Sequence, residues 1–76
     1  MTTYNGHRSK AYWNVSLWIN NDYGLYRLAL DCVSHARNKR EAARQMFEAL
    51  KEAGIEKTPD GHAYSPAKIQ AAMVEM

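Results

Sequence analysis

The residues of this 76-residue sequence that could carry out covalent chemistry are one cysteine and three histidines. Cys32 and His35 are three positions apart, a spacing that on a helix brings a thiol and an imidazole close enough for a nucleophile and its base. The same helical pattern places Cys32 in the middle of an apolar stripe, where a thiol behaves as a small hydrophobic side chain and is unreactive. We therefore predict no catalytic residue, and a protein that is not an enzyme.

Metal and cofactor chemistry is equally unsupported by the spacing. His7, His35 and His62 are scattered, without the short intervals of a zinc site, and the acidic residues are too few and dispersed to enclose a cation. The sequence contains no glycine-rich phosphate loop and no serine elbow. We predict no metal and no cofactor.

A cluster of basic residues is the most distinctive charged feature. Four cations, Arg37, Lys39, Arg40 and Arg44, lie around a single anion, Glu41. Cations at the start of a helix are unfavourable because they oppose its macrodipole. A binding site for an anionic partner would explain why they are there, and a solvated surface is the alternative explanation. The predicted partner-binding residues are Arg37, Lys39, Arg40, Arg44, Arg8, Lys10 and Tyr23.

The elements that position these residues are predicted to be helices. Cap residues and apolar periodicity give a first helix over 10–20 behind Ser9, a second from Asp22 to His35, a third that follows Asn38 and ends at Gly54, and a last one that begins at Ser65 and Pro66. The third is the best defined, because Asn38 and Glu41 have the spacing of a capping box. The last helix is expected to bury Ile69, Ala72, Met73 and Met76.

Between the third and fourth helices, residues 58–61 read Thr-Pro-Asp-Gly, a strong turn signal. We expect a small β-hairpin there that pairs residues 55–57 with 62–64. The predicted fold is mainly α: a compact bundle of about four helices, with residues 1–76 as a single domain.

The first helix is apolar on two sides. Tyr12, Val15 and Ile19 share one face with Ala11 and Trp18, whereas Trp13 and Leu17 fall on the opposite face. The first set is expected in the core. A chain this small has little material to cover both sides, so Trp13, Leu17 or Tyr23 could instead anchor a partner.

The composition of the chain indicates the cellular compartment in which the protein works. A single cysteine cannot form an internal disulfide, and no apolar run is long enough for a signal peptide or a membrane helix. Residues 1–44 hold 7 Lys/Arg and 3 Asp/Glu, whereas residues 45–76 hold 3 and 5, so the net charge of +2 is unevenly spread. We predict a cytoplasmic protein without membrane contact whose basic half attracts an acidic partner.

Two segments carry a resemblance. Residues 3–29, "TYNGHRSKAYWNVSLWINNDYGLYRLA", and later "TPDGHAYSPAKI", resemble a family of small phage and mobile-element proteins with a Tyr-Asn-Gly opening followed by Trp-Asn-Val-x-Leu-Trp. The matching residues are Tyr4, Asn5, Gly6, Trp13, Asn14, Val15, Leu17 and Trp18. The resemblance implies a stoichiometric inhibitor of host defence, such as an anti-CRISPR protein that occludes a CRISPR effector complex. We also expect the Asn5-Gly6 turn to fold the N-terminal segment over the second apolar face of the first helix.

A second function remains open. The second and third helices with their short junction have the outline of a helix-turn-helix, which would place Lys39, Arg40, Ala43 and Arg44 at the start of a recognition helix. The alternative is therefore a small DNA-binding regulator, with nucleic acid as partner. The sequence leaves the oligomeric state open between monomer and dimer.

Overall fold

The computed structural model describes residues 10–74 and 76, and this part of the chain forms four helices. They are α1 (Lys10–Asn21), α2 (Tyr23–His35), α3 (Lys39–Glu52) and α4 (Pro66–Ala72). The mainly α prediction is confirmed. Ser9, Arg8 and the N-terminal segment that we expected to cover α1 lie outside the described residues.

Local chemistry sets where three of the helices begin. The side chains of Asp22, Asn38 and Ser65 each accept a hydrogen bond from the backbone N–H three residues further on, at 3.0, 2.8 and 3.3 Å. Each bond satisfies one of the N–H groups that the first turn of a helix leaves without a partner. α3 ends just before Gly54, whose φ of 77° lies in the left-handed region that glycine adopts without strain.

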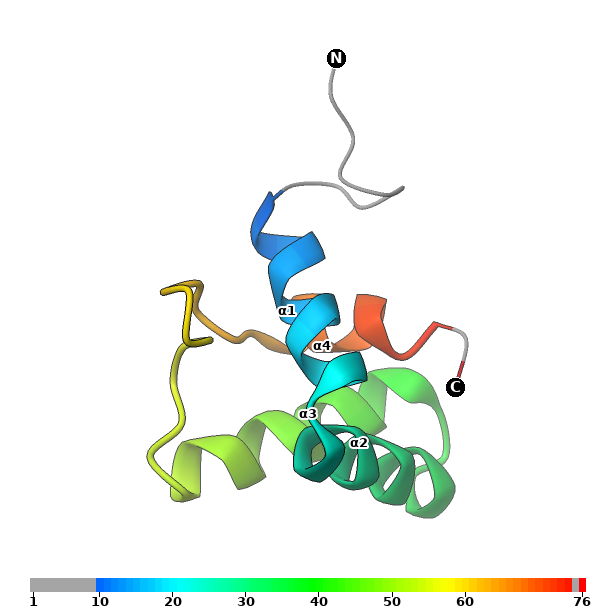
Figure 1. Cartoon of the computed structure of the whole chain (residues 1–76). Coiled ribbons are helices and arrows are strands. Elements are labelled where there is room, and N and C mark those ends of the chain that lie inside the picture. Colours follow the sequence, from blue (N-terminus) through cyan, green and yellow to red (C-terminus); the bar gives the residue numbers. More distant parts are fainter. Residues whose placement is uncertain (1–9, 75) are drawn as a thin grey trace.

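The helices pack in a closed cycle. α1 contacts α2, α2 contacts α3, α3 contacts α4, and α4 returns to α1, whereas the diagonal pairs do not approach each other closely. In Figure 1, α1 stands above α2 and α3, with α4 behind it. Large apolar side chains fill the centre of this cycle, and the largest fully buried ones are Val15, Ile19, Met46, Leu50, Ile69 and Met73. Each contributes about 1.5–3 kcal/mol of apolar burial to folding.

The segment between α3 and α4 differs from our prediction. The expected turn forms, since Gly61 N–H donates to Thr58 O at 2.8 Å, but the β-hairpin does not: within the described residues this segment has one isolated antiparallel bridge, between Lys57 and Ala63, and no strand. The segment rises from the end of α3 to the side of α1 before it enters α4 (Figure 1). Two backbone hydrogen bonds still join its sides, from Thr58 N–H to His62 O at 2.8 Å and from Tyr64 N–H to Glu56 O at 3.0 Å, while the side chains of Thr58 and Asp60 bond to α1.

Candidate functional site

The arginines of the predicted cluster lie on the exposed side of α3 and in the junction that precedes it. Arg37, Arg40 and Arg44 follow one another at helical neighbour spacing, and all three are exposed. Arg37 Nε lies 3.4 Å from Glu41 Oε2, with side chains 88% and 41% exposed, so this ion pair stabilises the fold little. No ion pair of Arg40 or Arg44 occurs within residues 10–74 and 76. The two guanidinium groups are available to a partner.

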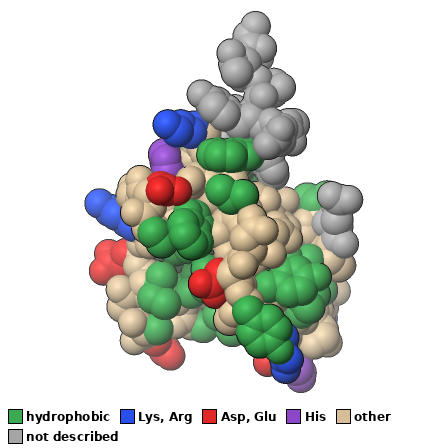
Figure 2. All heavy atoms as spheres, in the orientation of Figure 1, with side chains coloured by type: hydrophobic (Ala, Val, Ile, Leu, Met, Phe, Trp, Pro, Cys, Tyr) green, Lys and Arg blue, Asp and Glu red, His purple; other side chains and the backbone are tan. Residues whose placement is uncertain are grey.

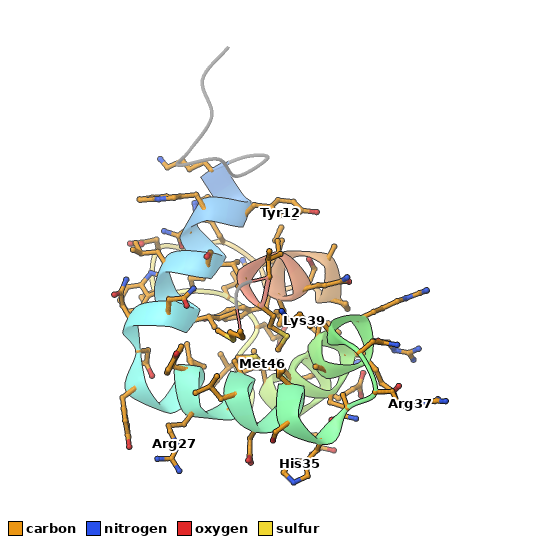
Figure 3. All side chains as sticks on the ribbon, turned by 90° about the vertical axis from the view of Figure 1, so that its right-hand side faces the viewer. Tyr12, Arg27, His35, Arg37, Lys39 and Met46 are labelled. Carbon is orange, nitrogen blue, oxygen red and sulfur yellow. The ribbon has the colours of Figure 1, made fainter. Side chains whose placement is uncertain are left out.

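Lys39 does not belong to this row. Its Nζ donates a hydrogen bond to the backbone carbonyl of Val74, at 2.8 Å, just beyond the end of α4. Figure 3 shows Lys39 directed toward α4, while Arg37 extends into solvent at the edge of the molecule. The structure therefore gives Lys39 a packing role and separates it from the arginines.

A shallow hollow of about 750 Å³ runs along the exposed side of α3. Its basic half comprises Arg37, Arg40 and Arg44, and its acidic half contains Glu48 and Glu52, toward the C-terminal end. Arg40 in the first turn and Glu52 in the last turn oppose the helix macrodipole, which favours anions at the N-terminus and cations at the C-terminus. Glu41 and Lys51 in the same two turns act in the favourable direction.

A second, mostly apolar groove of about 460 Å³ adjoins this hollow. It lies between the start of α2, the end of α3 and the following loop, and Ala49 lines both depressions. Ile55 stands at its rim with 40% of its surface exposed, and Tyr64, 5% exposed, is also among its lining residues. Figure 2 shows hydrophobic side chains on this face, between α1 and the loop that follows α3. Burial, and to a lesser extent the charge of Asp22, raises the pKa of the Tyr64 phenol, which therefore remains protonated.

A polar anchor that we did not foresee joins α1 to the loop before α4. The carboxylate Oδ2 of Asp60 accepts hydrogen bonds from Asn14 Nδ2 at 2.8 Å and from Trp18 Nε1 at 3.0 Å. Asn14, only 2% exposed, also accepts a 2.6 Å bond from the hydroxyl of buried Thr58. Thr58 Oγ1 in turn accepts from His62 N–H at 3.1 Å. We call these four residues, Asn14, Trp18, Thr58 and Asp60, the α1–loop anchor.

The anchor changes the electrostatics of its carboxylate. The hydrogen bonds from Asn14 and then Trp18 lower the pKa of Asp60 below its usual value, and the nearby charges of His62 and Lys10 act in the same direction. Lys10, one of the predicted binding residues, is exposed at the start of α1. A sequence signal for the anchor existed in the i, i+4 spacing of Asn14 and Trp18, which puts two donors on one helix face.

The remaining candidates are placed as follows. Tyr23 is 74% exposed at the start of α2, and Leu17 is 36% exposed on α1, whereas Trp13 is half-buried. Cys32 is half-buried, and desolvation, with a further contribution from Asp31, raises the pKa of its thiol. The His35 ring engages the carbonyl of Asp31 at 2.8 Å. This geometry favours an inert thiol.

No group of three or more His, Cys, Asp or Glu side chains that could hold a metal ion occurs among the described residues. None of the helices described is long and apolar enough to cross a bilayer.

Comparison with known proteins gives a family without a function. Residues 1–76 match the sequence model of DUF7249, a family of unknown function, and the chain belongs to that family. Searches of curated proteins and of solved structures returned no match.

Proposed function

We propose that this member of DUF7249 is a non-enzymatic protein-binding module whose contact surface is the exposed side of α3. The observation that carries the proposal is the junction at Ala49, where the arginine-lined hollow and the apolar groove meet. Protein interfaces combine apolar pockets that accept an anchoring side chain with arginines that fix orientation, and both features adjoin here.

The chemistry of this surface defines the partner it fits. An acidic patch would lie opposite Arg37, Arg40 and Arg44, and an apolar side chain would enter the groove beside Ile55. The charge gradient along α3 gives the partner a preferred direction, because Glu48 and Glu52 repel the same acidic patch. Steering by the arginines should make association faster at low salt.

For the biological role, we propose a stoichiometric inhibitor of a host defence complex, with a CRISPR effector subunit as the specific candidate. The support is the resemblance of residues 3–29 to small phage and mobile-element proteins, together with an arginine-lined surface suited to occluding an acidic site. Inhibition by occlusion requires binding and no turnover.

The test is binding to purified defence complexes, measured by pull-down and then by titration. We expect Arg40→Glu to weaken binding by about 10- to 100-fold, the loss typical of an interface hot spot. Lys51→Glu is the matched control, since Lys51 is exposed on the same helix and lines neither depression. Equal effects of the two variants would mean that only net charge matters and would remove the arginine row from the proposal.

A second pair of variants separates two possible anchoring sites. Ile55→Glu places a charge at the rim of the groove, and Leu17→Glu places one at the apolar side of α1, where the exposures are 40% and 36%. We expect only Ile55→Glu to impair binding. The opposite result would move the contact surface to α1.

DNA binding is the second candidate function, favoured by the connection of α2 to α3. Residues 36–38 form a short junction between α2 and α3, and the two helices are in contact, as in a helix-turn-helix. Against it, Glu41, Glu48 and Glu52 share the exposed side of α3 and would repel phosphates. A mobility shift that weakens steeply with salt and is lost in Arg40→Glu would establish DNA binding. A lack of any shift at low salt would exclude it.

A further inference from the structure

The solvent side of α2 carries a second exposed surface, distinct from α3. Tyr23, Tyr26 and Leu30 follow one another at helical spacing and keep 74%, 37% and 37% of their surfaces exposed. Figure 2 shows hydrophobic side chains gathered over α2 with a basic side chain at their edge. Tyr26 also borders a notch of about 340 Å³ between α1, α2 and the end of α4, where Val74 is 66% exposed. An apolar stripe of this kind marks an interaction surface.

Charged side chains on the same side of α2 indicate what kind of partner binds this surface. Arg27 and Asp31 lie one turn apart beside the apolar stripe, so the surface carries one cation and one anion. Arg27 is held along the helix by Tyr23: its Nη1 donates to the Tyr23 hydroxyl at 3.0 Å, and its guanidinium carbon lies 5.7 Å from the ring centre. Asp31 Oδ1 lies 3.9 Å from His35 Nδ1, and both side chains are about three-quarters exposed.

We propose that this α2 face binds a second copy of the same chain, with the two α2 helices antiparallel about a two-fold axis. A two-fold interface must be complementary to itself, so that residue i meets residue j of the other copy and j meets i. An axis midway between positions 27 and 31 places each Arg27 opposite Asp31 of the other copy and brings Tyr26 near Leu30. Arg44 and Glu48 of α3 have the same spacing, but none of the exposed large apolar residues among the described residues lies on α3, whereas α2 adds Tyr23, Tyr26 and Leu30 to its charge pair.

The proposed dimer should be weak and reversible. α2 is about 20 Å long, so one helix per copy gives a contact at the small end of specific interfaces. Sedimentation velocity of the intact chain over a micromolar to millimolar series should show a rise from the monomer to the dimer coefficient. A coefficient that stays at the monomer value throughout would overturn the proposal.

A charge exchange tests the pairing itself. Arg27→Asp leaves two anions on the α2 face and Asp31→Arg leaves two cations, so each variant alone should sediment as a monomer. An equimolar mixture of the two should form a heterodimer, because every cross-pair is then opposite in sign. Far-UV circular dichroism confirms that each variant is folded.

The mixture of Arg27→Asp with Asp31→Arg distinguishes pairing between two copies from effects inside one helix. A defect that arises inside one helix would not be corrected by adding the other variant. Variants Arg44→Asp and Glu48→Arg reproduce the same spacing and charge changes on α3 and serve as the matched control. We expect each control variant to dimerise like the unmodified chain. Persistent dimers in Arg27→Asp or Asp31→Arg, or a mixture that stays monomeric, would overturn the proposed α2 interface.

Discussion

The α1–loop anchor makes a sharp prediction, because its central residue is a buried polar side chain on a helix. Asn14→Ala removes the acceptor of the Thr58 hydroxyl, a 2.6 Å bond between side chains that are 2% and 4% exposed. An unpaired buried donor costs about 1–3 kcal/mol, and the space left by the amide adds to that loss. We expect the free energy of unfolding to fall by about 2 kcal/mol, a large part of the stability of a chain this short.

The matched control is Asn20→Ala on the same helix. Asn20 is exposed, and its Nδ2 donates to Ser16 O at 2.8 Å within α1. Both variants gain the same helix propensity from alanine, so the difference between them isolates the anchor. Urea unfolding followed by far-UV circular dichroism measures that difference, and thermal melts should show Asn14→Ala about 8–16 °C below the control.

A double-mutant cycle tests the cause. Thr58→Val removes the hydroxyl, so Asn14→Ala should cost less in that background, with a coupling energy of about 1 kcal/mol. Two outcomes would refute the reasoning: Asn14→Ala as stable as Asn20→Ala, or strictly additive losses in the cycle.

Three further predictions concern stability. The pKa of Asp60 in the folded protein lies below the unperturbed 3.8, so the ionised carboxylate stabilises the fold above that pH and this effect is lost as the pH falls through the folded pKa. Asp60→Asn should therefore reduce the change of melting temperature with pH between about pH 5 and about pH 2, and an unchanged dependence on pH would contradict this. Gly54→Ala should lower the free energy of unfolding in urea by about 1 kcal/mol, because alanine is strained at a φ of 77°. The added Cβ would meet no atom within 4 Å, so a clash does not contribute, and an unchanged stability would contradict the strain argument. Lys39→Ala should lose about 0.5–1.5 kcal/mol with its bond to Val74, whereas Arg40→Ala should stay within about 0.5 kcal/mol, and the reverse order in thermal melts would refute their separate roles.

The features that the sequence predicted well are those determined by near neighbours. Asp22, Asn38 and Ser65 cap helices through bonds that span three residues, so a short pattern suffices to identify them. Gly54 ends α3 for an equally local reason. The number of helices and their bounds followed from these signals and from apolar periodicity.

Long-range polar contacts could not be predicted in this way. Asn14 interrupts the apolar face of its helix in the sequence, yet it is buried because Thr58, 44 positions away, supplies its partner. Lys39 falls inside a basic cluster, yet it bonds to Val74, 35 positions away. The hairpin prediction is not supported: the turn forms, but the described residues on its two sides are joined by one isolated bridge and two backbone hydrogen bonds and form no strand, while Thr58 and Asp60 bond to α1.

The position of the anchor also bears on what the resemblance can say about function. Three residues of the Trp-Asn-Val-x-Leu-Trp segment have structural tasks: Asn14 and Trp18 bind Asp60, and Val15 is fully buried. In this chain, these three residues therefore serve the fold and are not free to contact a partner. Arg40 and Arg44 form no ion pair within the described residues, so changing them leaves the anchor intact. Under the proposed function, a chain that kept the anchor but altered the exposed side of α3 should fold in the same way and bind a different partner.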